Sequence, residues 1–328
     1  MKAVSIQPKP QDGQTYTAAN PAPSSAIHFV DLPVPQALHP GQIVIRTKAT
    51  TVIRDSLTWP ELYADPPAHM GNDFAGIVIE VHRDEREFVP GDEVYGMTHA
   101  DRGGAWAEYA VVTTEEANLK PQSLSWAEAA ALPLSALTAD QALFVHAGLD
   151  VNAQQPKRVL VTGAAGAVGM FVVAFAAAAG NHVVAATSSN ARNEKFMRSM
   201  GAMEVVEYSQ LASRDKFDVV IDTVGGEVLA NCWKIVRDEA YLISVDSASW
   251  NFVEQHKKSG LSAGREGAHA KFFIVEPSRD SMKRISAAVE TRGIKGLVAK
   301  MLPFDQAREA YELSATRGYG RGKIVPVL

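Results

Sequence analysis

Apolar residues along the second half of the chain fall into short β-branched runs that are separated by stretches of helical period. The runs lie at residues 159–162, 182–186, 204–206, 219–222, 240–245 and 271–275. Helical spacing is found between or after them, as in residues 167–179 and 280–292. Strands that alternate with helices in this way predict a parallel, doubly wound sheet of the α/β class.

The first 125 residues have a different pattern. Short runs such as 43–47 and 77–81 are rich in β-branched residues and bounded by Gly, Pro or Asp, which is typical of a β-rich domain. A capping box then marks the change to helical period, with Ser125 as the N-cap and Glu128 three residues later. We expect a last strand, 323–328, to return to the β-rich block. The predicted domains are 1–125, completed by 295–328, and 126–294.

The composition of the 328 residues fits a soluble enzyme of two domains. Hydrophobic residues make up 46 %, enough for a core, and a net charge of −5 favours neither nucleic acid nor an anionic membrane as a partner. The chain starts without the apolar core of a signal peptide and has no apolar run of about 18 residues, so we expect a cytoplasmic protein. Cys232 is the single cysteine, which excludes an internal disulfide and a multi-cysteine zinc site.

The most informative segment lies between the run 159–162 and the helical stretch that follows. It reads Gly-Ala-Ala-Gly-Ala-Val-Gly over 163–169. Between a strand and a helix, such glycines let backbone N–H groups approach a pyrophosphate at the positive end of the helix. A flexible loop is the alternative, but the next strand at 182–186 favours a dinucleotide site. The candidate cofactor-binding residues here are Gly163, Ala165, Gly166, Ala167, Val168 and Gly169.

The end of the second strand indicates which dinucleotide binds. NAD-specific domains usually carry an acidic residue about 20 residues after the glycines, where it binds the ribose 2′-hydroxyl. Here the strand ends in a segment with Ser188, Ser189 and Arg192, and no carboxylate follows before Glu194. Because hydroxyl groups and a guanidinium suit a 2′-phosphate, we expect NADPH rather than NADH. The alternative is that Arg192 is only a solvated charge on a helix.

Further motifs occur in a fixed order along the chain. They are 71–76 (Gly-Asn-Asp-Phe-Ala-Gly), 89–96 (Val-Pro-Gly-Asp-Glu-Val-Tyr-Gly), 103–109 (Gly-Gly-Ala-Trp-Ala-Glu-Tyr), the 129–139 helix pair, 201–208, 222–226 and 322–325. Together with the glycine turn they resemble the medium-chain dehydrogenase/reductase superfamily, in its zinc-free quinone oxidoreductase and enoyl reductase branch. The resemblance covers nearly the whole chain. It implies a GroES-like catalytic domain and a Rossmann domain, with substrate and nicotinamide in the cleft between them.

The resemblance also implies a chemistry. Zinc-dependent members bind catalytic metal through Cys, His and Cys or Glu, and because this chain lacks such a set we expect no metal site. Hydride would pass from NADPH to a polarised acceptor, such as an enone, an enoyl thioester or a quinone. The implied cofactor residues beyond the glycine turn are Tyr208 at the 2′-phosphate end, Val224, Gly225 and Ser244 near the nicotinamide, and Lys323, which reaches either the cofactor or only solvent.

Three residues are candidates for the active site by the same resemblance. Tyr63 takes the place of a family tyrosine near the substrate, where its hydroxyl could donate a proton, or it is only an aromatic wall of the pocket. Thr138 matches a threonine close to the nicotinamide, or it only packs within a helix. Asp55 ends the segment 51–55 (Thr-Val-Ile-Arg-Asp), which lacks the Asn that commonly assists the family's active site. This departure suggests a reshaped pocket, or a structural Arg54–Asp55 pair.

Three functions are compatible with this sequence. The first is a reductase of an activated C=C bond or a quinone. The second, a trans-acting enoyl reductase for a carrier-bound acyl chain, would need a carrier-docking surface. Lys257, Lys258 and Arg265 either supply it or only belong to a solvated loop. The third is a non-catalytic NADPH-binding protein, since binding residues do not prove turnover. The resemblance further implies a homodimer through the strand 271–275, whose apolar edge is unfavourable when left open.

Overall fold

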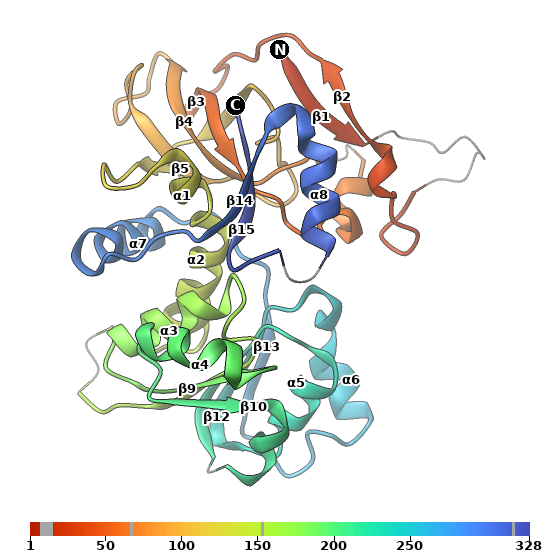
Figure 1. The fold of residues 1–328 in the computed structure, drawn as a ribbon, viewed down its shortest axis with the longest axis vertical. Helices are drawn as coiled ribbons and strands as arrows, with labels where there is room; N and C mark the ends of the chain where they lie inside the picture. Colours follow the sequence, from red (N-terminus) through yellow and green to blue (C-terminus); the bar gives the residue numbers. More distant parts are fainter. Residues whose placement is uncertain (7–15, 66–67, 152–153, 215, 317–318) are drawn as a thin grey trace. The chain divides into compact units, whose positions relative to one another are not determined.

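The computed structural model describes residues 1–6, 16–65, 68–151, 154–214, 216–316 and 319–328, and it divides into two compact units (Figure 1). Unit 1 contains residues 1–137 and 276–328, and unit 2 contains residues 138–275. The domain boundaries expected from the sequence differ from this division. The helices α1 (Trp126–Ala130) and α7 (Arg279–Arg292) belong to unit 1, because both pack on strands of that unit.

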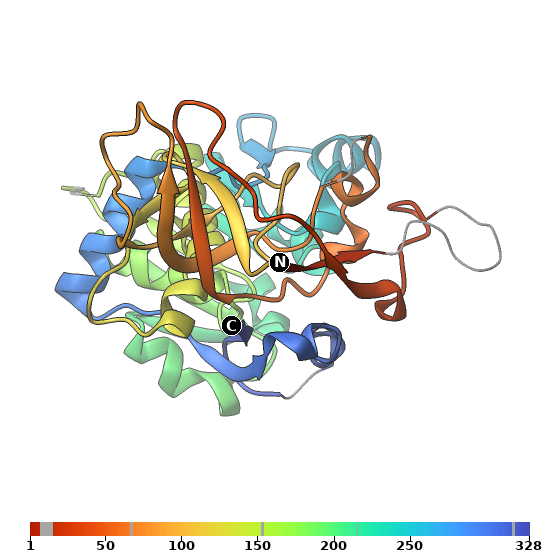
Figure 2. The same cartoon turned by 90° about the horizontal axis from the view of Figure 1, so that it is seen from above.

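Unit 1 is the β-rich part of the chain. Among the described residues, its larger sheet has the strand order β14-β15-β3-β4-β5-β7, with β6 paired to β3, and β1 pairs with β2 in a second sheet. The strands are β1 (Lys2–Ile6), β2 (Ile27–Asp31), β3 (Gln42–Thr50), β4 (Asp73–Val81), β5 (Glu93–Met97), β6 (Tyr109–Thr113), β7 (Ala117–Leu119), β14 (Val298–Pro303) and β15 (Lys323–Val327). Antiparallel pairing of β15 with β3 confirms that the last strand returns to the N-terminal block. Figures 1 and 2 accordingly show both chain ends in unit 1.

Unit 2 is built on a parallel sheet. In its described part the strand order is β10-β9-β8-β11-β12-β13. The strands are β8 (Arg158–Val161), β9 (His182–Thr187), β10 (Glu204–Glu207), β11 (Phe217–Asp222), β12 (Val236–Ser244) and β13 (His269–Phe272). The order reverses between β8 and β11, as in doubly wound sheets, which carry helices on both faces. This is the predicted doubly wound sheet. Ligands of such sheets bind beyond the carboxyl ends of the strands at the reversal point.

The helices follow from local sequence. The predicted capping box of α1 is present, since Ser125 Oγ accepts from the N–H of Glu128 and the Glu128 carboxylate accepts from the N–H of Ser125. α2 (Pro133–Asp140) continues directly into a π-helical segment, Gln141–His146. The other helices are α3 (Gly169–Ala178), α4 (Asn190–Ser199), α5 (Gly226–Cys232), α6 (Phe252–Lys258) and α8 (Ala307–Ala315). Within the described part of the chain, every helix is too short or too polar to cross a bilayer.

Candidate functional site

The glycine turn after β8 needs glycine at two positions. Gly163 has φ +62°, and a Cβ atom there would lie 2.1 Å from Thr223 Oγ1. A Cβ atom on Gly169, the first residue of α3, would lie 2.3 Å from the carbonyl oxygen of Gly163. The turn is closed by a 2.8 Å hydrogen bond from the N–H of Gly166 to that same oxygen. A larger side chain at Gly163 would therefore displace Thr223, and one at Gly169 would displace the backbone of the turn itself.

This turn presents backbone donors at the start of a helix. Among the described residues, the N–H groups of Ala167 and Val168 donate to no protein atom. Gly166 is exposed, and Ala167 and Val168 are half-buried. Unpaired N–H groups at the amino end of a helix attract anions, because the helix dipole adds a partial positive charge there. The turn therefore fits the pyrophosphate that the sequence predicts.

Tyr208 lies beside the same turn. It follows the last residue of β10, and its phenol oxygen accepts from the N–H of Gly163 at 3.1 Å. Burial raises the pKa of this half-buried phenol, so it is a neutral group that can still donate its own hydrogen. The sequence singled out Tyr208 but placed it at the 2′-phosphate end, whereas the structure shows its contact with the first glycine of the turn.

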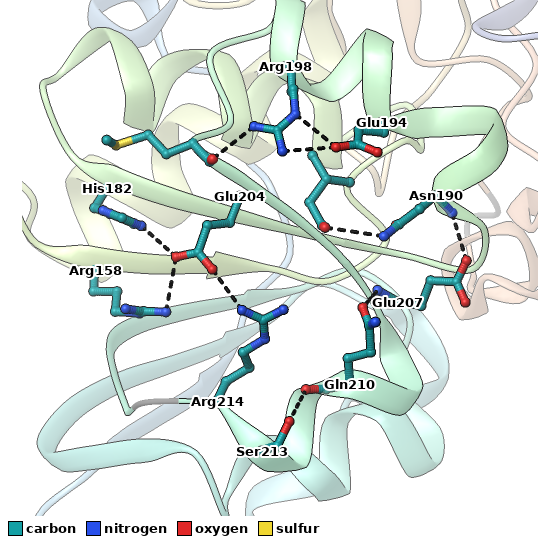
Figure 3. Close-up of polar contacts among 12 residues, drawn as sticks. Arg158, His182, Asn190, Glu194, Arg198, Glu204, Glu207, Gln210, Ser213 and Arg214 are labelled. Atoms are coloured by element: carbon teal, nitrogen blue, oxygen red, sulfur yellow. Dashed lines mark hydrogen bonds and ion pairs between the residues drawn. The ribbon is translucent and has the colours of Figure 1, made fainter.

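The segment after β9 carries the residues expected at the 2′-phosphate. Ser188 is exposed, Ser189 is the half-buried N-cap of α4, and Arg192 is exposed in the first turn of that helix. The register of the parallel sheet pairs Thr187, the last residue of β9, with Glu207 on β10. A carboxylate thus stands next to the strand end after which the sequence carries none before Glu194. Figure 3 shows its contact with Asn190, the first residue of α4. The sequence search had followed β9 alone and therefore missed it.

Asp222, at the end of β11, organises the reversal point of the sheet. It is fully buried, and its carboxylate accepts from the hydroxyls of Thr162 at 2.5 Å and Ser244 at 2.9 Å and from the N–H of Gly225 at 3.0 Å. Burial raises the pKa of this carboxyl, although the donors oppose the shift. Ser244 is itself fully buried, and its place near the nicotinamide stays a prediction. Its hydroxyl is used to fix Asp222.

Three other predicted cofactor or active-site residues lie in unit 2. Val224 is 37 % exposed directly after β11, and a Cβ atom on Gly225, which has φ +72°, would lie 2.1 Å from a carboxylate oxygen of Asp246. Both residues therefore belong to a loop that glycine shapes at the carboxyl edge of the sheet. Thr138 is 5 % exposed within α2. Its place beside the nicotinamide stays a prediction.

In unit 1, Tyr63 has a hydroxyl that is already engaged. It ends the short 3₁₀ helix Pro60–Tyr63, donates to the carbonyl oxygen of Leu57 at 2.5 Å and accepts from the N–H of Ala22 at 2.9 Å. Burial raises the pKa of the phenol. Because a phenol has one hydrogen, Tyr63 could donate to a substrate only by giving up the bond to Leu57. Its catalytic role therefore stays a prediction that this geometry does not favour.

The segment that contains Asp55 is fixed by a tyrosine that sequence reasoning missed. Tyr311 of α8 donates to the carbonyl oxygen of Arg54 at 2.8 Å, and its phenol oxygen accepts from the N–H of Leu57 at 3.4 Å. Asp55 lies between these two residues and is half-buried. Helical spacing alone gave no sign that Tyr311 points toward this segment.

Lys323 forms a buried ion pair. Its side chain is 8 % exposed, and its ammonium nitrogen lies 2.6 Å from the carboxylate of Asp73. Of the two places expected for this side chain, solvent is therefore excluded, and contact with the cofactor stays a prediction. Asp73 is fully buried and also accepts from the hydroxyl of Thr51 and the N–H of Leu134. This ion pair joins β15, β4 and the start of α2 within unit 1.

The described side chains that could serve as metal ligands are not grouped around one point. Among the described residues, no group of three or more His, Cys, Asp or Glu side chains is placed to share a metal ion. Burial raises the pKa of the Cys232 thiol well above its usual value, which disfavours the thiolate that zinc requires. The residues that the structure describes therefore do not fit a zinc site of the Cys/His type.

Comparisons with known proteins agree on the kind of protein. The Alcohol dehydrogenase GroES-like domain model matches residues 39–122, and the Zinc-binding dehydrogenase model matches residues 200–325. The chain is 34 % identical to the "Probable zinc-binding oxidoreductase, mitochondrial" of Arthroderma benhamiae, over 98 % of each chain. It is 30 % identical to the "NAD(P)H oxidoreductase RTN4IP1, mitochondrial" of Danio rerio, over 83 % of this chain and 75 % of that relative.

A solved structure gives the same result. The quinone oxidoreductase from Coxiella burnetii is similar with a TM-score of 0.82 and 25 % identity, and the match covers 100 % of both chains. The GroES-like sheet domain and the Rossmann-like parallel sheet predicted from the sequence are thus confirmed. The protein is an oxidoreductase whose relatives use a nicotinamide cofactor. The chain belongs to the medium-chain dehydrogenase/reductase superfamily, in its quinone oxidoreductase branch.

Proposed function

We propose that the protein is an NADPH-dependent reductase that delivers hydride to a quinone or to an activated C=C bond. The observation that carries this proposal is the carboxyl edge of the unit 2 sheet. It combines a turn that only glycine can form, unpaired helix N–H groups, and the exposed Ser188 and Arg192 after β9. The quinone is favoured as acceptor because the similar solved structure from Coxiella burnetii is a quinone oxidoreductase.

Different residues of this edge would bind different parts of NADPH. NADPH, when bound, supplies the hydride. The N–H groups of Ala167 and Val168 would hold the pyrophosphate, and Arg192 would pair with the 2′-phosphate through its guanidinium. Tyr208 keeps the first glycine in place through its phenol oxygen. Asp222 accepts from the N–H groups of Val224 and Gly225, and so would hold in place the loop that we propose beside the nicotinamide.

The acceptor needs only modest help from the protein. Hydride addition to an enone or a quinone leaves negative charge on an oxygen, which hydrogen-bond donors stabilise. A reduced quinone takes its protons from water, so a dedicated general acid is not required for that substrate. We propose Thr138, Asp55 and Tyr63 as the side chains nearest to this chemistry, on the resemblance to the family.

The direct test is turnover. Purified protein is assayed for NADPH oxidation against a panel of quinones, enones and enoyl thioesters, with NADH in parallel. We expect steady consumption of NADPH with at least one quinone or enone. Activity confined to enoyl thioesters on a carrier protein would favour the trans-acting enoyl reductase. Tight binding of NADPH without turnover on any acceptor would show a non-catalytic binding protein.

A pair of glycine variants connects this activity to the turn. Gly163→Ala and Gly180→Ala both introduce a side chain at positive φ, +62° and +81° respectively. The new Cβ atom clashes with Thr223 only in Gly163→Ala, since nothing lies within 4 Å of that position at Gly180. We expect Gly163→Ala to lose most NADPH binding and Gly180→Ala to keep it. Equal effects would contradict the assignment of the turn.

We also propose a homodimer. β13 is one of the two edge strands of the parallel sheet among the described residues, and the half-buried Phe272 ends it, with the exposed Ile274 two residues further. An open edge of this kind favours pairing with a second copy. Light scattering should give the mass of a dimer at micromolar concentration, and a monomeric mass would overturn this proposal.

A further inference from the structure

Glu207 occupies a position where dinucleotide-binding sheets use an acid to select their cofactor. In NAD-specific sheets, that acid ends the second strand and binds the ribose 2′-hydroxyl. Here the second strand, β9, ends in Thr187, and the register of the sheet places Glu207 of the neighbouring strand β10 directly beside it. The acid that β9 lacks is thus supplied from the adjacent strand.

The carboxylate of Glu207 is held across the gap between β10 and α4. Its Oε1 atom accepts from the N–H of Asn190, the first residue of α4, at 2.9 Å (Figure 3). Asn190 is fixed in turn, because its side chain donates to the carbonyl oxygen of Val205 at 3.2 Å and accepts from the hydroxyl of Thr187. The position of the carboxylate relative to the end of β9 is therefore well defined.

The charge of Glu207 is not neutralised locally. Within the described part of the chain, its carboxylate accepts from the backbone N–H groups of Asn190 and Gln210, and no Lys, Arg or His forms an ion pair with it. Glu204, at the other end of the same strand, is bound by Arg158, His182 and Arg214, which Figure 3 also shows. Two glutamates of one strand thus differ in whether their charge is compensated.

We propose that Glu207 limits the affinity of the site for a 2′-phosphate and so keeps NADH acceptable beside NADPH. Its negative charge opposes a phosphate bound at the end of β9, while Arg192 and the serines attract it. This inference rests on the proposed function, in that it assumes that the carboxyl edge of the sheet binds a nicotinamide dinucleotide. Ser188, Ser189 and Arg192 would favour NADPH, and Glu207 would reduce that preference.

The hydrogen bond and the charge of Glu207 can be separated. Glu207→Gln keeps an oxygen that can accept from Asn190 and removes only the charge. Glu194→Gln is the matched control, because it also replaces a glutamate by glutamine. Glu194 lies on α4, one helical turn after Asn190, and pairs with Arg198. Glu207→Ala is a second variant, which removes the charge together with the hydrogen bond.

The experiment uses two ligands that differ only by the group in question. Wild type and the three variants are titrated by calorimetry with adenosine 2′,5′-bisphosphate and with adenosine 5′-monophosphate, and the ratio of the two dissociation constants is compared. We expect Glu207→Gln to raise the preference for the 2′-phosphate about three- to tenfold. Glu194→Gln should change it less than twofold. Because the ratio compares two ligands on one protein, partial loss of folded Glu207→Ala does not alter it, and that variant should move in the same direction.

The outcomes separate this inference from the proposed function. If neither Glu207 variant raises the preference for adenosine 2′,5′-bisphosphate, while wild type prefers that ligand to the monophosphate, the role of Glu207 alone is overturned. If wild type prefers adenosine 5′-monophosphate and both Glu207 variants shift the preference toward the bisphosphate, the role of Glu207 stands and the NADPH preference is wrong. If wild type binds neither ligand, both proposals fail.

Discussion

Each unit contains a fully buried aspartate, and the two carboxylates are satisfied in different ways. Asp73 in unit 1 pairs with the ammonium of Lys323 at 2.6 Å. Asp222 in unit 2 accepts only from hydroxyl and backbone N–H groups among the described residues, chiefly those of Thr162, Ser244 and Gly225. The carboxylate of Asp73 is neutralised by a cation, whereas that of Asp222 is stabilised by neutral hydrogen-bond donors.

The two aspartates have different roles, because Asp73 stabilises the fold of unit 1 and Asp222 positions a loop of unit 2. The Asp73–Lys323 pair joins elements of unit 1 that are far apart in sequence, and a buried charge of this kind is strongly unfavourable once its partner is removed. Asp222 contacts two strand ends and the start of the loop after β11, where the geometry supports cofactor binding. Its donors orient that loop without placing a fixed positive charge beside the site. We therefore expect the first cluster to control folding and the second to control binding.

The two ends of β10 repeat this contrast. A hydrogen bond from His182, together with the charges of Arg158 and Arg214, lowers the pKa of Glu204 at the amino end. Glu207, at the carboxyl end, is bound by backbone N–H groups. On β10 the cations thus gather at the amino end, away from the carboxyl edge at which ligands of such sheets bind.

The largest expected effect is that of Lys323→Met. It leaves Asp73 buried and without its cation, so the free energy of unfolding should fall by about 3–5 kcal/mol, measured by denaturant titration. Lys295→Met is the matched control, because Lys295 forms an ion pair with Glu128 in the same unit but is 55 % exposed. That change should cost less than about 1 kcal/mol. Similar losses in the two variants would contradict the structural role of the buried pair.

Asp222→Asn should have a smaller effect on stability and a larger one on binding. The amide presents an NH₂ group to donors that now face a carboxylate, which should cost about 1–3 kcal/mol of unfolding free energy. NADPH affinity should fall as well, because the loop from Val224 loses its anchor. A variant that unfolds like wild type and binds NADPH normally would break the comparison between the two aspartates.

The pH dependence of stability gives an independent check on Asp222. Because burial raises the pKa of this carboxyl in the folded state, its contribution to stability is full below the ordinary aspartate pKa of 3.8 and is lost as pH rises through the raised pKa. The difference in unfolding free energy between wild type and Asp222→Asn should therefore shrink as pH increases over this range. A difference that grows with pH would mean that the pKa is lowered instead.

Tyr63→Phe tests whether the hydrogen bonds of the Tyr63 hydroxyl stabilise unit 1 or serve catalysis. The change removes the hydrogen bonds to Leu57 and Ala22, and we expect a loss of about 1–2 kcal/mol in stability with little change in kcat on a quinone. Tyr109→Phe is the control, since its hydroxyl has no hydrogen-bond partner among the described residues. A fall in kcat of about 10²-fold or more on an enone would instead show that Tyr63 is a general acid.

Much of the fold could be predicted because its signals are local. The alternation of apolar runs and helical period, the glycine turn and the Ser125 capping box all lie within short segments, and the structure contains each of them. The site was harder, because it depends on which way a side chain points. Neither the burial of Ser244 and Lys323 nor the contact of Glu207 with α4 follows from the spacing of residues along one strand. Those facts depend on strand register and on partners distant in sequence.

The central claim is that the carboxyl edge of the unit 2 sheet binds NADPH through its 2′-phosphate. The most direct measurement is the titration of wild type and Arg192→Ala with NADPH and with NADH. We predict that wild type binds NADPH more tightly, and that Arg192→Ala weakens NADPH about ten- to a hundredfold, because a charged donor to the phosphate is lost. NADH affinity should stay nearly unchanged. Equal weakening of both cofactors, or tighter binding of NADH by wild type, would contradict the claim.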